Sequence, residues 1–247
     1  MIEIKLITIL IIGAASGFLG AIAGGGGLIS IPFLLFLGIP PQIALATNKF
    51  GGMGLSLGGL YKFIKEKKIV WKYAIVLSCA GILGSLIGSR ILLTINVAIL
   101  QKLIGILLIL LVPTFFFKKS FGIEEKQTSR NRKIVGCFLY FLVAIVASIF
   151  GGLGAVTMSI VILFFGLSII KANATELVSY SAFSLVSVII FAFNGIIDYK
   201  TGIVLFLGMM IGGYLGAHTA IKKGDKWVKI IFALVVIASA IKILLSR

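Results

Sequence analysis

The sequence predicts an all-α polytopic membrane protein built from two homologous repeats of about four transmembrane helices each. Three observations lead to this fold class: an apolar composition, a succession of apolar runs long enough to cross a bilayer, and a match between the two halves of the chain. Each half also contains a glycine-rich break followed by a short apolar segment, which indicates short broken or re-entrant helices.

The composition alone indicates a membrane protein. Of the 247 residues, 60% are hydrophobic and only 12% are charged, and the mean hydropathy is +1.21. A soluble domain has about 45–50% apolar and about 25% charged residues. The chain therefore has too little polar surface to face water on all sides.

Eight apolar runs approach the roughly 20 residues that a bilayer-crossing helix needs. In chain order they are Leu6–Ile22, Ile43–Leu60, Trp71–Leu93, Val97–Phe117, Ile134–Phe150, Thr175–Phe193, Gly202–Ala220 and Val228–Leu245. Two shorter apolar segments, Leu28–Leu37 and Ala155–Phe165, follow glycine-rich breaks. At about 1.5 Å per residue, each short segment reaches only about half of the hydrocarbon core.

A shift of 128 residues aligns the chain with itself without a gap. Gly24 then falls on Gly152, Gly26 on Gly154, and Ala46-Thr47 on Ala174-Thr175. We therefore expect an N-terminal transmembrane repeat at 1–117, a basic linker at 118–133 and a C-terminal transmembrane repeat at 134–247. Two such repeats are a common architecture of secondary transporters.

The number of crossings in each repeat stays open at this point. If each short segment forms one broken span with the next helix, a repeat has four crossings and the repeats are parallel. If it counts as a crossing of its own, a repeat has five and the repeats are inverted. Both arrangements place the basic linker in the cytoplasm of a multi-pass protein of the cell (inner) membrane, because Lys and Arg favour the inner side.

The glycine-rich breaks are the first candidate binding elements. Irregular backbone at membrane depth is tolerated only against protein or a watery cavity. A helix broken at Gly24–Gly27 presents a new N-terminus at Leu28, with unpaired N–H groups and a partial positive charge that suit an anion. We expect the site to include Gly24, Gly25, Gly26, Gly27, Gly151, Gly152 and Gly154. By contrast, the small-residue spacing at Gly84 and Gly88 favours helix packing.

The helix after each break begins with polar residues. "ATNKF" supplies Thr47, Asn48 and Lys49, and the matching "ATELV" supplies Thr175 and Glu176. An ionisable residue within the membrane is a functional hypothesis by default, because burying its charge is costly. Lys49 would balance a bound anion, and Glu176 would carry protons as the coupling ion. The alternative is that both side chains extend to water at the interface.

Several other functions lack the residues that they need. The basic residues cluster in short polar breaks at Lys62–Lys72, Lys118–Lys133 and Lys222–Lys229, as in membrane proteins, so we expect no nucleic acid partner. One His and two separated Cys make no metal site or thiol relay, and no catalytic constellation is present. We expect neither an enzyme nor a cofactor. A channel or a membrane-embedded enzyme or assembly factor remains the alternative to a carrier, and monomer and homo-oligomer are both open.

The sequence resembles the TauE/SafE family of sulfite exporters. The resemblance rests on "GFLGAIAGGGGLISIPFLL" from Gly17, on its degenerate second copy from Ala147, and on Gly38, Pro40, Ala44, Ala46, Thr47 and Asn48. It covers essentially the whole chain and implies export of sulfite, sulfonates or related sulfur oxyanions, driven by an ion gradient. The second copy departs from the first, because Ile160 matches Pro32 and Glu176 matches Asn48.

Overall fold

The computed structural model describes residues 2–94, 96, 122–149 and 153–231, and every regular element in these ranges is an α-helix. The elements are α1 (Ile2–Ala23), α2 (Gly27–Phe36), α3 (Pro41–Lys65), α4 (Trp71–Leu92), α6 (Arg130–Ile149), α7 (Gly154–Phe165), α8 (Ile169–Phe193) and α9 (Tyr199–Lys223). The expected span Val97–Phe117 and most of Val228–Leu245 lie outside the described residues.

Local sequence sets the ends of these helices. Pro41 is the first residue of α3, a position where its missing N–H costs nothing. Gly38 and Gly166, which follow α2 and α7, have φ of +80° and +73°, a conformation that glycine adopts at little cost. Asp198 precedes α9, and its side chain accepts a hydrogen bond from the Thr201 N–H.

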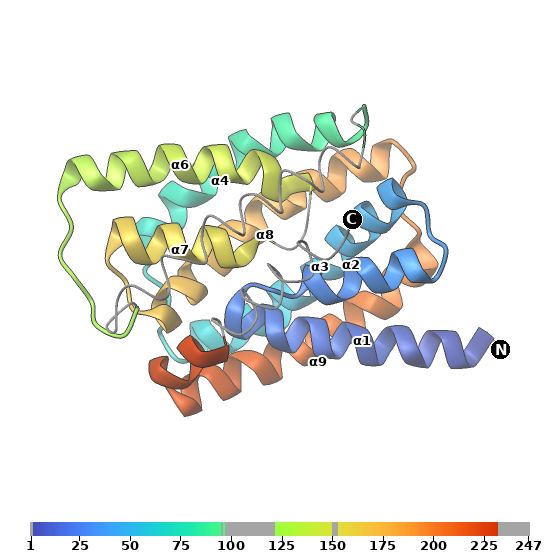
Figure 1. Cartoon of the computed structure of the whole chain (residues 1–247), viewed down its shortest axis with the longest axis horizontal. Helices are drawn as coiled ribbons and strands as arrows, with labels where there is room; N and C mark the ends of the chain where they lie inside the picture. The colour runs from blue at the N-terminus through green and yellow to red at the C-terminus, as the bar shows by residue number, and fades with distance from the viewer. Residues whose placement is uncertain (1, 95, 97–121, 150–152, 232–247) are drawn as a thin grey trace.

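The helices form two bundles, and each bundle takes one helix from the other half of the chain (Figure 1). The first bundle, α1, α2, α3 and α9, contains three helices of the N-terminal half and one of the C-terminal half. The second bundle, α4, α6, α7 and α8, is the reverse. The two halves are therefore interlocked by an exchange of α4 and α9.

Glycine contacts fix the helix directions in the first bundle. A Cβ on Gly13 of α1 would lie 2.9 Å from the Leu205 carbonyl oxygen of α9. Further towards the C-terminal ends of both helices, a Cβ on Gly216 of α9 would overlap the Phe18 backbone of α1. Contacts thus advance together along both chains, so α1 and α9 are parallel. The same progression, from Gly51 at Leu205 to Gly59 near Gly213, makes α3 parallel to them.

The second bundle has the same internal arrangement and the opposite direction. Ser85 and Ser89 of α4 meet Ser187 and the Phe183 carbonyl of α8, so α4 and α8 are parallel. Along α3 and α8 the contacts run in opposite directions, from Gly52 at Tyr180 to Gly59 at Leu177, so the two bundles run in opposite senses. Of the two arrangements left open by the sequence, the described helices have the inverted one.

The helix bounds keep the 128-residue offset. The helix α3 covers residues 41–65 and α8 covers 169–193, while α4 begins at residue 71 and α9 at residue 199. The short helices α2 and α7 agree with the expected short segments to within one residue at each end. Each half thus presents its elements in the same order.

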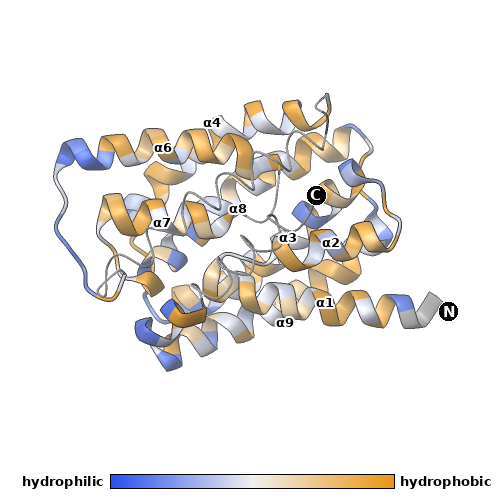
Figure 2. Ribbon diagram, viewed as in Figure 1, coloured by the Kyte–Doolittle hydropathy of each residue, from blue (hydrophilic) through white to orange (hydrophobic). Residues whose placement is uncertain are grey.

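The outer surface of the bundles is apolar. Five described helices, α1, α4, α6, α8 and α9, are long and apolar enough to cross a membrane. Large apolar side chains such as Ile75, Leu83, Ile203 and Ile211 are about half exposed. Figure 2 shows hydrophilic residues concentrated at helix ends and along the linker before α6. This surface suits lipid, and together with the span-length helices it makes the chain a multi-pass membrane protein.

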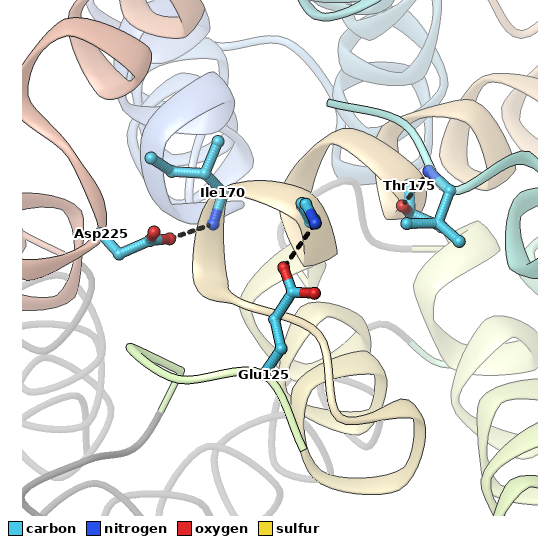
Figure 3. A network of polar contacts seen from close by, with 6 residues as sticks. Glu125, Ile170, Thr175 and Asp225 are labelled. Atoms are coloured by element: carbon cyan, nitrogen blue, oxygen red, sulfur yellow. Dashed lines mark hydrogen bonds and ion pairs between the residues drawn. The ribbon is translucent and has the colours of Figure 1, made fainter. Parts of the chain in front are cut away.

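The basic segments gather at one face. Lys68, Glu125, Lys171 and Asp225 line one cavity of about 210 Å³ there, although they come from three polar breaks and the start of α8. Figure 3 shows the contacts: Glu125 pairs with Lys171 at 2.7 Å, and the Asp225 carboxylate accepts the Ile170 N–H at 2.8 Å. The linker is thereby tied to the N-terminal end of α8.

Candidate functional site

The two helix breaks meet inside the molecule. Gly24, which follows α1, has φ +67° and lies against the backbone of Gly154, the first residue of α7. A Cβ on Gly154 would stand 2.7 Å from the Gly24 carbonyl oxygen, and a Cβ on Gly24 would overlap the Gly154 carbonyl group. Only glycine allows this approach, so the predicted breaks of the two halves form one crossing point.

The backbone N–H groups without partners at the first break are not the ones that the sequence predicts. The helix α2 begins at Gly27, and the N–H groups of Leu28 and Ile29, expected to be unpaired, donate to the carbonyl oxygens of Gly25 and Gly26 at 3.1 Å. Among the described residues, the N–H groups of Gly25, Gly26 and Gly27 have no hydrogen-bond partner. The available donors therefore lie in the glycine run itself. Gly151 and Gly152 lie outside the described residues.

Lys49 is fully buried at the interface between the bundles. Its Nζ donates to the Ala147 carbonyl oxygen of α6 at 2.6 Å. The same Nζ lies 5.0 Å from the ring centre of Tyr180 and 4.8 Å from that of Phe183, both on α8. A carbonyl at a helix C-terminus and two aromatic faces are all partners for a cation. Lys49 therefore does not extend to water.

Glu176 is also buried, with 3% of its surface exposed. Its Oε1 accepts a hydrogen bond from the Thr157 hydroxyl, 2.7 Å away, in the first turns of α7. The carboxylate thus lies at the N-terminal end of a short helix, where the helix dipole favours negative charge. At the 128-related position, the Asn48 side chain accepts a short hydrogen bond from the Ser30 hydroxyl of α2.

Thr47 and Thr175 have structural partners. The Thr47 hydroxyl accepts the Asp198 N–H at 3.0 Å, and the Thr175 hydroxyl accepts the Val70 N–H at 3.1 Å. Val70 and Asp198 precede α4 and α9, the two exchanged helices, and are themselves 128 residues apart. Each threonine therefore holds the start of a helix that crosses into its own bundle.

Three residues near the crossing were not expected from the sequence: Ser30, Thr157 and Asn173. Ser30 and Thr157 each occupy the fourth position of a short helix, and Asn173 of α8 donates to the Ala21 carbonyl oxygen in the last turn of α1. Ser30 is an isolated polar residue within the apolar sequence of α2, and that isolation was the available signal. Thr157 and Asn173 each lie two residues from another polar side chain and do not stand out in this way.

The candidate site contains charged side chains, but its described residues do not form a cluster of metal-binding side chains. Among the described residues, no group of three His, Cys, Asp or Glu side chains comes together. The candidate residues instead include the glycine amides of the first break, which have no partner among the described residues, the buried Lys49 ammonium and the buried Glu176 carboxylate. These groups can hold a small anion and exchange a proton without covalent chemistry.

Comparisons with known proteins point to transport. Residues 9–243 match the protein family described as "Sulfite exporter TauE/SafE". A Haemophilus influenzae protein named "Probable membrane transporter protein" is 31% identical over 92% of this chain and 90% of its own length. "Probable membrane transporter protein ORF9" of Sinorhizobium sp (93% and 88% covered) and "Probable membrane transporter protein YfcA" of Escherichia coli (92% and 83% covered) are each 28% identical. No solved structure matches the chain.

Proposed function

Because the chain belongs to the TauE/SafE sulfite exporter family, we propose that it is a secondary transporter that moves a small anion across the inner membrane by alternating access. The proposed substrate class is sulfite, a sulfonate or a related sulfur-containing oxyanion. The linker 118–133 is proposed to face the cytoplasm, since the basic segments share its side.

The observation that carries this proposal is the buried crossing of the two breaks. Three glycine amides without described partners and the Lys49 ammonium are held in an apolar surrounding, where their attraction for an anion is weakly screened. The first break suits the anion better than the second, since Asn48 is neutral and Glu176 would repel it. Gly24–Gly27, Asn48 and Lys49 are therefore the proposed anion ligands.

The remaining candidate residues are proposed to support the site. Thr47 and Thr175 position the exchanged helices, and Gly154 allows the breaks to meet. Glu176, at the N-terminal end of α7, is the proposed proton carrier. Access would alternate through movement of the first bundle against the second, since their contact runs through the site.

Counterflow in proteoliposomes tests this function. Liposomes containing the purified chain are loaded with unlabelled sulfite and given labelled sulfite outside. A carrier accumulates label transiently above equilibrium, and sulfonates should compete while a neutral solute should not. Accumulation would support a carrier and rule out a channel, which cannot drive uphill exchange.

Protein-free liposomes and liposomes with a Lys49→Met variant provide the controls. Failure to accumulate sulfite or any of its competitors, in preparations that retain a cooperative thermal transition, would withdraw the sulfur-anion assignment and favour the channel alternative if passive flux remained.

A further inference from the structure

A cluster of four buried serines lies beside the second break. Ser85 and Ser89 of α4, Ser187 of α8 and Ser148 of α6 are all 0% exposed. The Ser187 Oγ lies 2.9 Å from both the Ser85 Oγ and the Ser89 Oγ. The helices α4 and α8 thus contribute hydroxyl oxygens to one small volume, whereas the Ser148 hydroxyl donates to the Ile145 carbonyl oxygen of its own helix.

Main-chain oxygens complete this cluster. The Phe183 carbonyl oxygen is 2.8 Å from the Ser85 Oγ and 3.3 Å from the Ser187 Oγ. The Ser148 carbonyl oxygen, in the last turn of α6, is 3.4 Å from the Ser187 Oγ. Oxygen atoms alone form these contacts, and none of them belongs to a carboxylate.

The end of α6 already holds a positive charge. Helix C-termini carry a partial negative charge, and the Lys49 ammonium donates to the Ala147 carbonyl oxygen at 2.6 Å, one residue from Ser148. This contact is independent of the serines, and it shows that a cationic group is stable at the same helix end.

The cluster exists in only one bundle. At the 128-related positions of the first bundle, the four serines correspond to Gly20, Gly59, Gly213 and Ala217. The first bundle packs its equivalent helices with these small side chains, and a Cβ on Gly59 would be 3.8 Å from the Gly213 carbonyl oxygen. Close helix packing therefore does not require the hydroxyl groups.

We propose that this serine cluster is a binding site for a monovalent alkali cation, with Na⁺ as the best-fitting class. Hydroxyl and carbonyl oxygens are ligands for hard cations, and broken helix ends near the midplane coordinate Na⁺ in other transporters. Neutral ligands suit a single charge, whereas a divalent ion favours carboxylates. Ser187 lies at the centre of the cluster and would turn its oxygen toward the ion.

Lys49 links this cation site to the anion site, an extension that rests on the proposed function. The ammonium of Lys49 and a bound Na⁺ would compete for the same helix end. A substrate anion that draws Lys49 away from Ala147 would leave that end open to Na⁺. Anion and cation would then bind cooperatively, because each favours the same position of Lys49.

Thermal unfolding of the detergent-solubilised chain tests the cation site without any transport measurement. Melting temperatures are compared in NaCl, KCl and choline chloride at equal ionic strength, so that general screening is constant. Free Na⁺ at about five times its dissociation constant should raise the melting temperature by about 2–4 °C. Ser187→Ala should remove this Na⁺-specific rise.

Two further variants sharpen the result. Ser181→Ala is the matched control, because Ser181 is on the same helix and, among the described residues, its hydroxyl donates to the Leu177 carbonyl of that helix alone. This variant should keep the Na⁺-specific rise in melting temperature. Lys49→Met removes the competing ammonium. The Na⁺ concentration at which the melting temperature reaches half of its maximal rise should therefore be about tenfold lower in this variant.

The outcomes separate this inference from the proposed function. Equal melting temperatures in the three salts, or a Na⁺ effect that survives in Ser187→Ala, would overturn the site and leave the serines as interhelical hydrogen bonds. Counterflow without a Na⁺-specific stability change would retain the carrier and reject the site. A Na⁺-specific change without counterflow would retain the site and reject the sulfur-anion carrier.

Discussion

Lys49 illustrates how a charged residue is accommodated at membrane depth. A lysine at the centre of a spanning helix costs about 2.5–3.5 kcal/mol on insertion scales. Here the ammonium has a carbonyl acceptor on α6 and the faces of Tyr180 and Phe183. These contacts offset the cost but leave room for a further partner, since an ammonium has three donors.

Lys49→Met should reduce exchange more than it reduces stability. The variant removes the ammonium but keeps an unbranched side chain of similar length. A hydrogen bond to a charged group contributes about 1.5–3 kcal/mol, so anion affinity should fall about tenfold or more. Counterflow rates over a range of sulfite concentrations measure the change.

The matched control for this variant is Lys171→Met, which removes the exposed ion pair with Glu125. An exposed pair contributes about 0–1 kcal/mol, so this variant should exchange normally. If Lys49→Met exchanged normally as well, Lys49 would have a packing role only.

Glu176→Gln should make exchange insensitive to pH. Glutamine has the shape of a protonated glutamate and can accept the Thr157 hydrogen bond, but it cannot take up or release a proton. Among the described residues, Lys49, Tyr140 and Tyr180 are the nearby titratable groups that interact electrostatically with Glu176. If Glu176 carries the coupled proton, the wild-type rate should change across the physiological pH range and the variant rate should stay constant. Parallel pH profiles for the two proteins would assign the proton to another group.

At the scale of the element, glycine governs how the helices meet. In the first bundle, Gly54 and Gly58 of α3 lie against the backbone of α9 at Phe206 and Met210. In lipid, helices associate through such close packing, because apolar side chains gain little by leaving a solvent as apolar as themselves. The long helices therefore combine span length with an interface that larger residues would push apart.

The crossing of the two breaks can be tested with a pair of alanine variants. Gly24 and Gly38 both have positive φ, +67° and +80°, so alanine should cost about 1–3 kcal/mol of backbone strain at each. A Cβ at Gly24 would also overlap the Gly154 backbone, whereas nothing lies within 4 Å of a Cβ at Gly38. Gly24→Ala should therefore lower the melting temperature further and abolish exchange.

The comparison isolates the contact between the breaks, because the shared backbone strain cancels between the two variants. The effect of losing this contact is measured on stability by the melting temperature and on exchange by counterflow. Equal destabilisation by Gly24→Ala and Gly38→Ala, with exchange retained in both, would show that the close approach of Gly24 to Gly154 is not needed.

At the scale of the whole molecule, the two halves have opposite orientations. Glu66 and Asn194 occupy 128-related, exposed positions after α3 and α8. Because α3 and α8 run in opposite senses, these positions should lie on opposite sides of the membrane. In a parallel arrangement they would lie on the same side.

Single cysteines at these positions test the orientation. In a chain whose Cys79 and Cys137 are replaced by alanine, Glu66→Cys and Asn194→Cys are exposed to a membrane-impermeant thiol reagent. In vesicles of one orientation, one variant should react and the other should not, and inverted vesicles should reverse the result. Labelling of both variants from the same side would contradict the inverted arrangement.

Much of the architecture could be predicted from local sequence. Apolar runs gave the positions of the long helices, because length and hydropathy are properties of a single segment. The glycine run from Gly24 marked the first break, since the positive φ of Gly24 is a local requirement. The choice between parallel and inverted halves could not be made in this way, because both arrangements use the same segments.

The candidate site was predictable in its residue types and not in its contacts. Lys49 and Glu176 stood out as ionisable residues within apolar sequence. Their partners, Ala147 and Thr157, belong to other segments, and a carbonyl acceptor leaves no trace in residue identity. The roles of Thr47 and Thr175 as acceptors for Asp198 and Val70 likewise depend on which helices cross between the bundles.

The exchange of α4 and α9 has a consequence for biosynthesis. A ribosome adds about 5–20 residues per second, so α9 is completed about 10–40 s after α1. During that interval the glycine faces of α1 and α3 are already in the bilayer while their permanent neighbour is still unmade. During assembly, any other apolar helix in the bilayer can therefore compete with α9 for the glycine faces of α1 and α3 before α9 is synthesised.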